Sequence, residues 1–163
     1  NIIYLSKNYH KYPQMKEKFI SYRKVKEYIK NISECITKSS WKPDLIISVN
    51  RGGCVPGIYL SHLIDVNHEV LTLSKNKKTN NSTYIKSVMG KYKSILIIDD
   101  INDTGKTMKE VSEIYIDFLD KLKFAVLIDN KASEFKVNFF SYKIDKNVDN
   151  SWIVFPWESI DSE

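Results

Sequence analysis

One segment, Lys93–Met108, constrains the fold of this chain more than any other. It reads KSILIIDDINDTGKTM and opens with the apolar run Ile95–Ile98, which is typical of a strand buried on both faces. The polarity then reverses, because three acidic residues follow within five positions: Asp99, Asp100 and Asp103. We therefore expect a buried strand that ends in an acidic turn.

The residues after this turn predict an anion site at the start of a helix. From Met108 to Leu122 apolar residues recur at helical spacing, and the helix follows the loop Thr104–Thr107, which contains Gly105. Unpaired N–H groups at a helix N-terminus bind phosphate well, and Gly105 lets the backbone approach it closely. The carboxylates would repel a bare anion, but they suit sugar hydroxyls or a divalent cation. The segment thus predicts a ligand with a phosphate, a ribose and a metal ion.

Other known phosphate-site motifs do not match the sequence of this segment. A Walker A loop needs a glycine five positions before Gly105, where the chain has Asp100. A G-x-G-x-x-G fingerprint is absent, and an aspartyl-phosphate hydrolase would need a second Asp where Ile101 stands. The segment instead resembles the type I phosphoribosyltransferase signature: four apolar residues, two acidic residues, two further residues, and Asp-Thr-Gly-x-Thr.

The resemblance implies roles for this segment. Asp99 and Asp100, the acid pair, would hold the ribose hydroxyls directly or through Mg²⁺, with Asp100 as the metal ligand beside substrate oxygens. Their negative charge would favour a cationic sugar. Asp103 would contact the imidazole nitrogen of the base and manage its proton. These three are the predicted catalytic residues, and the phosphate loop would hold the 5′-phosphate through Asp103, Thr104, Gly105, Lys106 and Thr107.

An earlier strand and glycine loop predict the diphosphate site. The apolar run Leu45–Val49 leads into the loop Asn50–Gly53 and then into an apolar helix through about Ile64. Two glycines let backbone N–H groups face an anion, and an arginine adds charged donors. In the resemblance this diphosphate loop holds the leaving group through Asn50, Arg51, Gly52 and Gly53. The letters Arg-Gly-Gly-x-Val-Pro-Gly are similar to the bacterial xanthine-guanine branch of the family.

The same branch suggests where the base binds. After a predicted strand at Phe124–Ile128, Lys131 matches a lysine that donates to the purine 6-oxo group. Near the chain end, Trp152 matches a tryptophan that stacks on the base, and Ile153 matches a residue whose backbone meets the base edge. We expect Trp157 to be a packing residue.

The rest of the chain is less informative. Ser21 is a plausible N-cap for a core-facing helix at Tyr22–Lys38. Short strands are expected at Val70–Leu73 and Val137–Tyr142. The lysine-rich segment Ser74–Lys91 has little periodicity and reads as a solvated loop; the resemblance implies a mobile loop there that closes over the reaction centre.

Composition narrows the class of protein. The chain has 163 residues and a net charge of +5, with no apolar run long enough to span a membrane and no secretory signal. Cys35 and Cys54 lack metal or redox spacing, which favours a reducing compartment, and we expect a cytoplasmic protein. A basic balance suits a polyphosphate substrate or nucleic acid equally, but no nucleic-acid motif is present, so we expect neither nucleic acid nor membrane as a partner.

Alternating strand and helix patterns predict one α/β domain, residues 1–163, with a mainly parallel twisted sheet flanked by helices. The core would span about 21–142, and a small hood would come from about 1–20 and 143–163. The predicted function is Mg²⁺-dependent transfer of the 5-phosphoribosyl group from phosphoribosyl diphosphate to guanine, xanthine or hypoxanthine in purine salvage. Association into a homo-dimer or homo-tetramer is implied by the resemblance. Two alternatives stay open: a non-catalytic regulator of the same fold that senses phosphoribosyl diphosphate or a nucleotide, and a transferase for another base.

Overall fold

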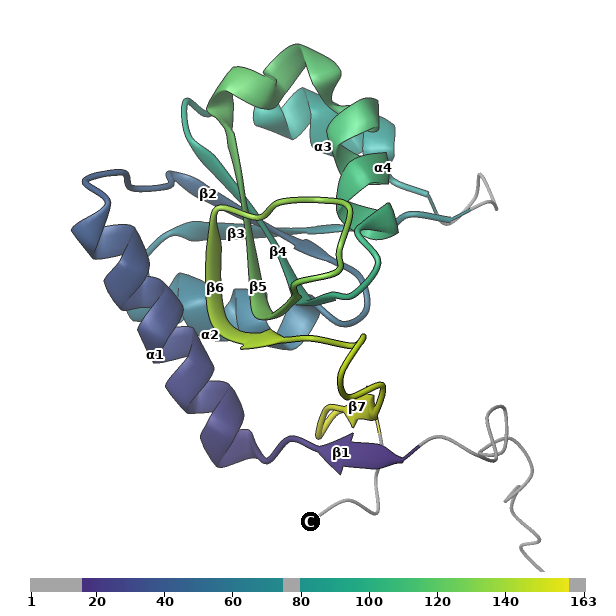
Figure 1. Cartoon of the computed structure of the whole chain (residues 1–163). Helices are drawn as coiled ribbons and strands as arrows, with labels where there is room; N and C mark the ends of the chain where they lie inside the picture. Colours follow the sequence, from purple (N-terminus) through teal and green to yellow (C-terminus); the bar gives the residue numbers. More distant parts are fainter. Residues whose placement is uncertain (1–15, 75–79, 159–163) are drawn as a thin grey trace, which may run out of the picture.

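A five-stranded parallel sheet forms the centre of the computed structural model, which describes residues 16–74 and 80–158 (Figure 1). The spatial order is β3-β2-β4-β5-β6, and every neighbouring pair is parallel. The predicted mainly parallel α/β sheet is therefore confirmed. The strands are β2 (Leu45–Val49), β3 (Asn67–Leu71), β4 (Ile95–Asn102), β5 (Leu122–Asn130) and β6 (Phe139–Ile144).

Helices cover both faces of this sheet. Helices α1 (Tyr22–Lys38) and α2 (Cys54–Ile64) pack on one face, and α3 (Ser82–Met89) and α4 (Lys106–Ile114) pack on the other. Because successive strand residues point to opposite faces, Leu96 and Ile98 join the first layer while Ile95 and Ile97 join the second. This explains why the run is apolar at every position.

Helix α1 has the predicted bounds, because the N-cap residue and the spacing of the buried apolar residues indicate the same helix. The Ser21 Oγ accepts a hydrogen bond from the Lys24 N–H at 3.3 Å. The residues at helical spacing are buried: Val25, Ile29, Ile32 and Ile36.

Two sequence-based boundaries around the acidic segment were wrong. Strand β4 continues through Asn102, which pairs with Asp129 of β5, so the acid pair lies on the strand and not in a turn. Helix α4 ends at Ile114, and a 3-10 helix, η1 (Ile116–Lys121), replaces the rest of the predicted helix. The break occurs because Tyr115 is fully buried, has non-helical backbone angles, and donates its hydroxyl to the Ser82 carbonyl oxygen at 3.2 Å.

The polar segment before β4 also differs from the expected solvated loop. Within the described part of Ser74–Lys91, α3 forms and buries Ile85, Val88 and Met89, which have helical spacing. The Asn81 side chain anchors the start of α3 by donating to the Val70 carbonyl oxygen and accepting from the Thr72 N–H. Strand β3 begins and ends earlier than predicted, and β6 begins and ends later.

A second, two-stranded sheet brings together segments from opposite ends of the sequence. Strands β1 (Glu17–Phe19) and β7 (Trp152–Val154) pair in parallel beside the main sheet (Figure 1). The Trp152 N–H donates to the Lys16 carbonyl oxygen at 2.7 Å, and the Ile20 N–H donates to the Val154 carbonyl oxygen at 2.9 Å. These strands belong to the segments predicted as a hood; residues 1–15 and 159–163 of that prediction lie outside the described residues.

The strand order creates a crevice at one edge of the main sheet. From β2 the chain moves outward to β3, and it then returns to the other side of β2 as β4. Helices α2 and α4, which follow β2 and β4, therefore leave toward opposite faces. Ligands of open α/β sheets bind at such a reversal, outside the carboxyl ends of the strands. In the part of the chain that the structure describes, no helix is both long and apolar enough to cross a membrane.

Packing of α2 on the sheet gives a stability prediction. A Cβ added at Gly57 would overlap Ser48 Oγ, which is itself 2.7 Å from His68 Nε2. We expect Gly57→Ala to lower the free energy of unfolding by about 1–3 kcal/mol through overpacking. Adding Ser48→Ala should relieve part of this loss, so the two changes together should cost less than the sum of the single changes. Urea denaturation measures all three.

Gly90→Ala is the matched control, because its added Cβ would meet no atom closer than 3.5 Å. Equal losses for Gly57→Ala and Gly90→Ala, or strict additivity with Ser48→Ala, would contradict this account of the packing.

Candidate active site

A cavity of about 600 Å³ lies at the carboxyl ends of β2 and β4, a size typical of small-molecule sites. The predicted site residues that line it come from three segments far apart in the sequence. They are Asn50, Arg51, Gly52, Asp99, Asp100, Asp103, Thr104, Gly105, Lys106, Thr107 and Trp152. The convergence follows from the parallel strands, whose carboxyl ends share one edge of the sheet.

The acid pair forms the buried floor of this cavity. Asp99 and Asp100 are each 9% exposed, and the Asp100 N–H donates to Asp99 Oδ1 at 2.9 Å. Burial, followed by the neighbouring Asp100 charge, raises the pKa of Asp99. Burial, followed by the charge of Glu158, raises the pKa of Asp100 to about 6. Neither carboxylate has an ion-pair partner among residues 16–74 and 80–158.

The diphosphate loop touches the acid pair at Gly52. A Cβ at this glycine would overlap the Asp100 carboxylate, so only a residue without a side chain fits here. The Asn50 N–H donates to the Leu71 carbonyl oxygen at 2.8 Å, its Nδ2 donates to Thr72 Oγ1, and the Asn50–Arg51 peptide bond is cis. The fourth predicted residue of the loop, Gly53, is buried at the start of α2 and does not line the cavity.

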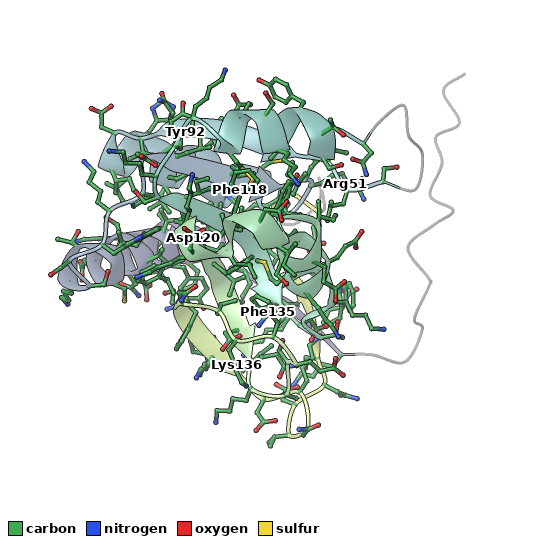
Figure 2. All side chains as sticks on the ribbon, turned by 90° about the horizontal axis from the view of Figure 1, so that it is seen from above. Arg51, Tyr92, Phe118, Asp120, Phe135 and Lys136 are labelled. Atoms are coloured by element: carbon green, nitrogen blue, oxygen red, sulfur yellow. The ribbon has the colours of Figure 1, made fainter. Side chains whose placement is uncertain are left out.

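Gly105 determines the backbone conformation of the phosphate loop. This residue has φ of +91°, a conformation that favours glycine, and an added Cβ would lie 2.6 Å from the Phe135 nitrogen. The Glu134 N–H donates to the Thr104 carbonyl oxygen at 3.2 Å, so the loop rests on the segment after β5. In Figure 2, Arg51 and Phe135 lie apart, on the loops after β2 and β5 respectively.

The N-terminus of α4 opens onto the same cavity. The helix begins at Lys106, and its N-cap, Gly105, provides no side chain to cap the first N–H groups. Lys106, Thr107 and Met108 line the cavity. Partial positive charge at the start of α4 is therefore available to a phosphate.

Asp103 is held by two residues that sequence reasoning missed. The Asn130 Nδ2 donates to the Asp103 carbonyl oxygen at 2.9 Å and to its Oδ1 at 3.2 Å. The Lys146 Nζ donates to Asp103 Oδ2 at 2.8 Å and forms an ion pair. The polar end of β5 was visible in the sequence, but nothing in the local pattern around Lys146 pointed to Asp103.

The predicted base-binding residues are divided between two cavities. Trp152 lines the main cavity and is 41% exposed, so part of its ring is open to a ligand. Lys131 and Ile153 instead line a second cavity of about 310 Å³. Trp157 stacks on Phe155 with ring centroids 4.8 Å apart, and it also lines the main cavity.

Comparison with known proteins identifies the family. Residues 12–161 match the phosphoribosyl transferase domain family. The chain belongs to the phosphoribosyltransferase family. It is 31% identical over 118 residues to a xanthine-guanine phosphoribosyltransferase of Nitratidesulfovibrio vulgaris, a match that covers 70% of this chain and 68% of the relative. The predicted family, and its closeness to the bacterial xanthine-guanine branch, are thus confirmed.

Solved phosphoribosyltransferases share the fold. The purine phosphoribosyltransferase of Pyrococcus horikoshii superposes with a TM-score of 0.69 at 25% identity, covering 91% of this chain and 98% of that one. A xanthine-guanine-hypoxanthine phosphoribosyltransferase of Helicobacter pylori gives a TM-score of 0.69 at 20% identity, covering 87% and 93%. This phosphoribosyltransferase therefore has the parallel sheet of its structural relatives.

The buried acid pair gives a prediction for the unliganded protein. Because the pKa of Asp100 is raised to about 6 from an ordinary 3.8, the folded state binds more protons than the unfolded state between these values. Stability contributed by this group therefore falls as pH rises from 4 to 6, and the penalty is complete near pH 7. Asp100→Asn should raise the free energy of unfolding at pH 7.5 by up to about 3 kcal/mol, with little gain at pH 4.

Chemical denaturation of both proteins at several pH values measures this difference. The exposed Asp120→Asn is the control, because it removes a carboxylate at the protein surface. A gain for Asp100→Asn that does not grow with pH would rule out the buried charge as its cause.

Proposed function

We propose that this phosphoribosyltransferase transfers the 5-phosphoribosyl group from phosphoribosyl diphosphate to a 6-oxopurine base such as guanine, xanthine or hypoxanthine. The observation that carries the proposal is the convergence of the diphosphate loop, the acid pair, the phosphate loop and Trp152 around one cavity. The xanthine-guanine phosphoribosyltransferase of Nitratidesulfovibrio vulgaris, to which the chain is similar, supports a purine as acceptor. Because the reaction reuses a free base, its place is purine salvage.

The two glycine loops suit the two phosphorylated ends of the substrate. The phosphate loop, with the N-terminus of α4 beside it, suits the 5′-phosphate. The diphosphate loop lies against Asp100 and carries Arg51, whose guanidinium can donate to the leaving diphosphate. The ribose then lies over the acid pair, where carboxylates accept hydrogen bonds from its hydroxyls.

The acid pair also fits a magnesium ion that shares its ligands with the substrate. No group of three or more potential metal-ligating side chains is found among the described residues. Mg²⁺ commonly takes one or two carboxylates together with substrate oxygens, and the Asp100 carboxylate lines the cavity without an ion pair to any described residue. We propose Asp100 as its protein ligand. When bound, Mg²⁺ supplies positive charge that stabilises the departing diphosphate.

The chemical step is a displacement at the anomeric carbon of the ribose. A base nitrogen forms a bond to this carbon as the bond to the diphosphate oxygen breaks, and the diphosphate leaves with the electron pair. The acid pair stabilises the positive charge that develops on the sugar. Asp103 accepts the proton that the imidazole ring of the base must lose. Asn130 and Lys146 keep its carboxylate in place.

A turnover assay with a panel of bases tests this function. With phosphoribosyl diphosphate and Mg²⁺, we expect nucleotide formation from at least one of guanine, xanthine and hypoxanthine, with adenine and orotate about 100-fold slower or worse. Binding of phosphoribosyl diphosphate without turnover of any base would indicate a sensing regulator instead. Preference for adenine or orotate would indicate a transferase for another base.

Removal of the proposed proton acceptor should separate binding from chemistry. Asp103→Ala should lower kcat by about 100- to 1000-fold, because it deletes an acid-base group, while phosphoribosyl diphosphate still binds. Calorimetric titration with phosphoribosyl diphosphate and steady-state kinetics measure the two effects. The exposed Asp120→Ala serves as control, and unchanged turnover in Asp103→Ala would refute the role.

A further inference from the structure

Asn102, the last residue of β4, is the most buried polar residue of that strand. It is 2% exposed, and it pairs across the sheet with Asp129 of β5. The Asn102 Nδ2 donates to Asp129 Oδ1 at 2.8 Å and to the Phe135 carbonyl oxygen at 2.9 Å. The Asn102 Oδ1 accepts a hydrogen bond from Ser133 Oγ at 3.0 Å. A buried amide is unfavourable unless its polar atoms are bonded, so this Asn102 network fixes the positions of its members.

The Asn102 network supports the phosphate loop from behind. A Cβ added at Gly105 would lie 2.6 Å from the Phe135 nitrogen and 2.9 Å from Ser133 Oγ, so the loop packs directly on these two residues. The Glu134 N–H, between them in the chain, donates to the Thr104 carbonyl oxygen at 3.2 Å. The segment 133–135 therefore contacts the phosphate loop on one side and is bonded to the end of β4 on the other.

The polar atoms of the Asn102 side chain are not available to a ligand. Asn102 lines the main cavity, but its Nδ2 and Oδ1 are both engaged by the network. Asp129, Ser133 and Phe135 do not line this cavity. An effect of the network on the substrate therefore passes through the phosphate loop. Misplacement of a binding group by about 1 Å can cost about 100-fold in rate, so a shift of the segment 133–135 would weaken the contact with the 5′-phosphate.

A second amide–carboxylate pair follows directly, with the two partners exchanged between the strands. Asn102 donates to Asp129, whereas the next residue along the chain, Asp103, accepts from Asn130 Nδ2 at 3.2 Å. The Asn102–Asp129 pair is buried, and the Asp103 carboxylate lies at the main cavity. The two pairs join the ends of β4 and β5 at the point where the phosphate loop begins.

We propose that Asn102 is a positioning residue for the 5′-phosphate of the substrate, acting together with Asp129 and Ser133. It holds the segment on which the phosphate loop rests, and it thereby sets the affinity of this loop for a phosphoryl group. The proposal rests on the proposed function, which gives the 5′-phosphate to this loop. The diphosphate loop follows β2 and packs against Asp100, so its affinity for diphosphate should not depend on Asn102.

Two small probes separate the two loops. Ribose 5-phosphate carries only the 5′-phosphate, and inorganic diphosphate with Mg²⁺ carries only the leaving group, so calorimetric titration with each reports on one loop. Asn102→Asp removes both N–H donors and places a carboxylate against Asp129. We expect it to weaken binding of ribose 5-phosphate by about 10- to 100-fold, with binding of diphosphate unchanged. In steady-state kinetics, KM for phosphoribosyl diphosphate should rise while KM for the base stays the same.

An exchange of the two partners tests the hydrogen bond itself. Asp129→Asn alone should have little effect, because an amide oxygen still accepts from Asn102 Nδ2. Combined with Asn102→Asp, it restores one N–H···O bond in the opposite direction. The double variant should therefore recover part of the affinity for ribose 5-phosphate that Asn102→Asp loses, and the two changes should not be additive.

Two further variants complete the test. Ser133→Ala removes only the hydroxyl group, and it should weaken binding of ribose 5-phosphate by about 2- to 10-fold, so it serves if Asn102→Asp does not fold. Asn67→Asp is the control, because it makes the same change at an exposed position at the start of β3, at the amino end of the sheet. Retained binding of diphosphate shows that a variant is folded.

Two results would overturn the proposal: equal losses for ribose 5-phosphate and diphosphate, or wild-type affinity for ribose 5-phosphate in both Asn102→Asp and Ser133→Ala. Failure of the proposed function would look different, because the wild type itself would then form no nucleotide from any base, while the two probes could still be compared. A wild type that does not bind ribose 5-phosphate would overturn both.

Discussion

The acid pair at the end of β4 depends on the packing of the strand that carries it. Two adjacent carboxylates are buried, and no described residue forms an ion pair with either. Burial of charge is unfavourable unless a partner compensates, and the packing of β4 offsets the cost of keeping the acid pair in this place. The strand lies between β2 and β5, and its apolar run Ile95–Ile98 is fully buried on both faces, each side chain contributing about 2 kcal/mol. Under the proposed function, the ribose hydroxyls or a cation provide the partner for these two carboxylates.

Much of this design could be predicted from the sequence, because the decisive signals are local. An apolar run followed by acidic residues and a glycine loop predicts a buried strand, a ligand-binding edge of the sheet and the start of a helix. This prediction needs no knowledge of contacts with the rest of the chain. The errors arose where distant contacts decide. Pairing with β5 extends β4 through Asn102, and burial of Tyr115 ends α4 early. In α3, the apolar residues that pack on the sheet, such as Ile85, are few and are surrounded by polar residues. The sequence pattern therefore did not predict this helix.

The site shows the same division between local and distant determinants. The diphosphate loop and the phosphate loop could be predicted from the sequence because each directly follows an apolar strand. The residues that hold Asp103 were not visible, since Asn130 and Lys146 reach it from 27 and 43 positions away. Asn130 is buried at the end of β5, whereas the next residue, Lys131, has left the strand and is exposed. A shift of one residue reverses the direction of a side chain near a strand end, and the sequence pattern did not indicate that Asn130 turns inward to Asp103.

The pairing of β1 with β7 places Trp152, which the proposed function assigns to the base, on a different sheet from the acid pair. Trp152 takes its backbone position from the Lys16 carbonyl oxygen, while the acid pair and both glycine loops belong to the five-stranded sheet. The two sheets thus contribute residues from distant parts of the sequence to one cavity. Under the proposed function, a substitution in the two-stranded sheet can therefore alter the contact of Trp152 with the base while the acid pair and both glycine loops keep their places.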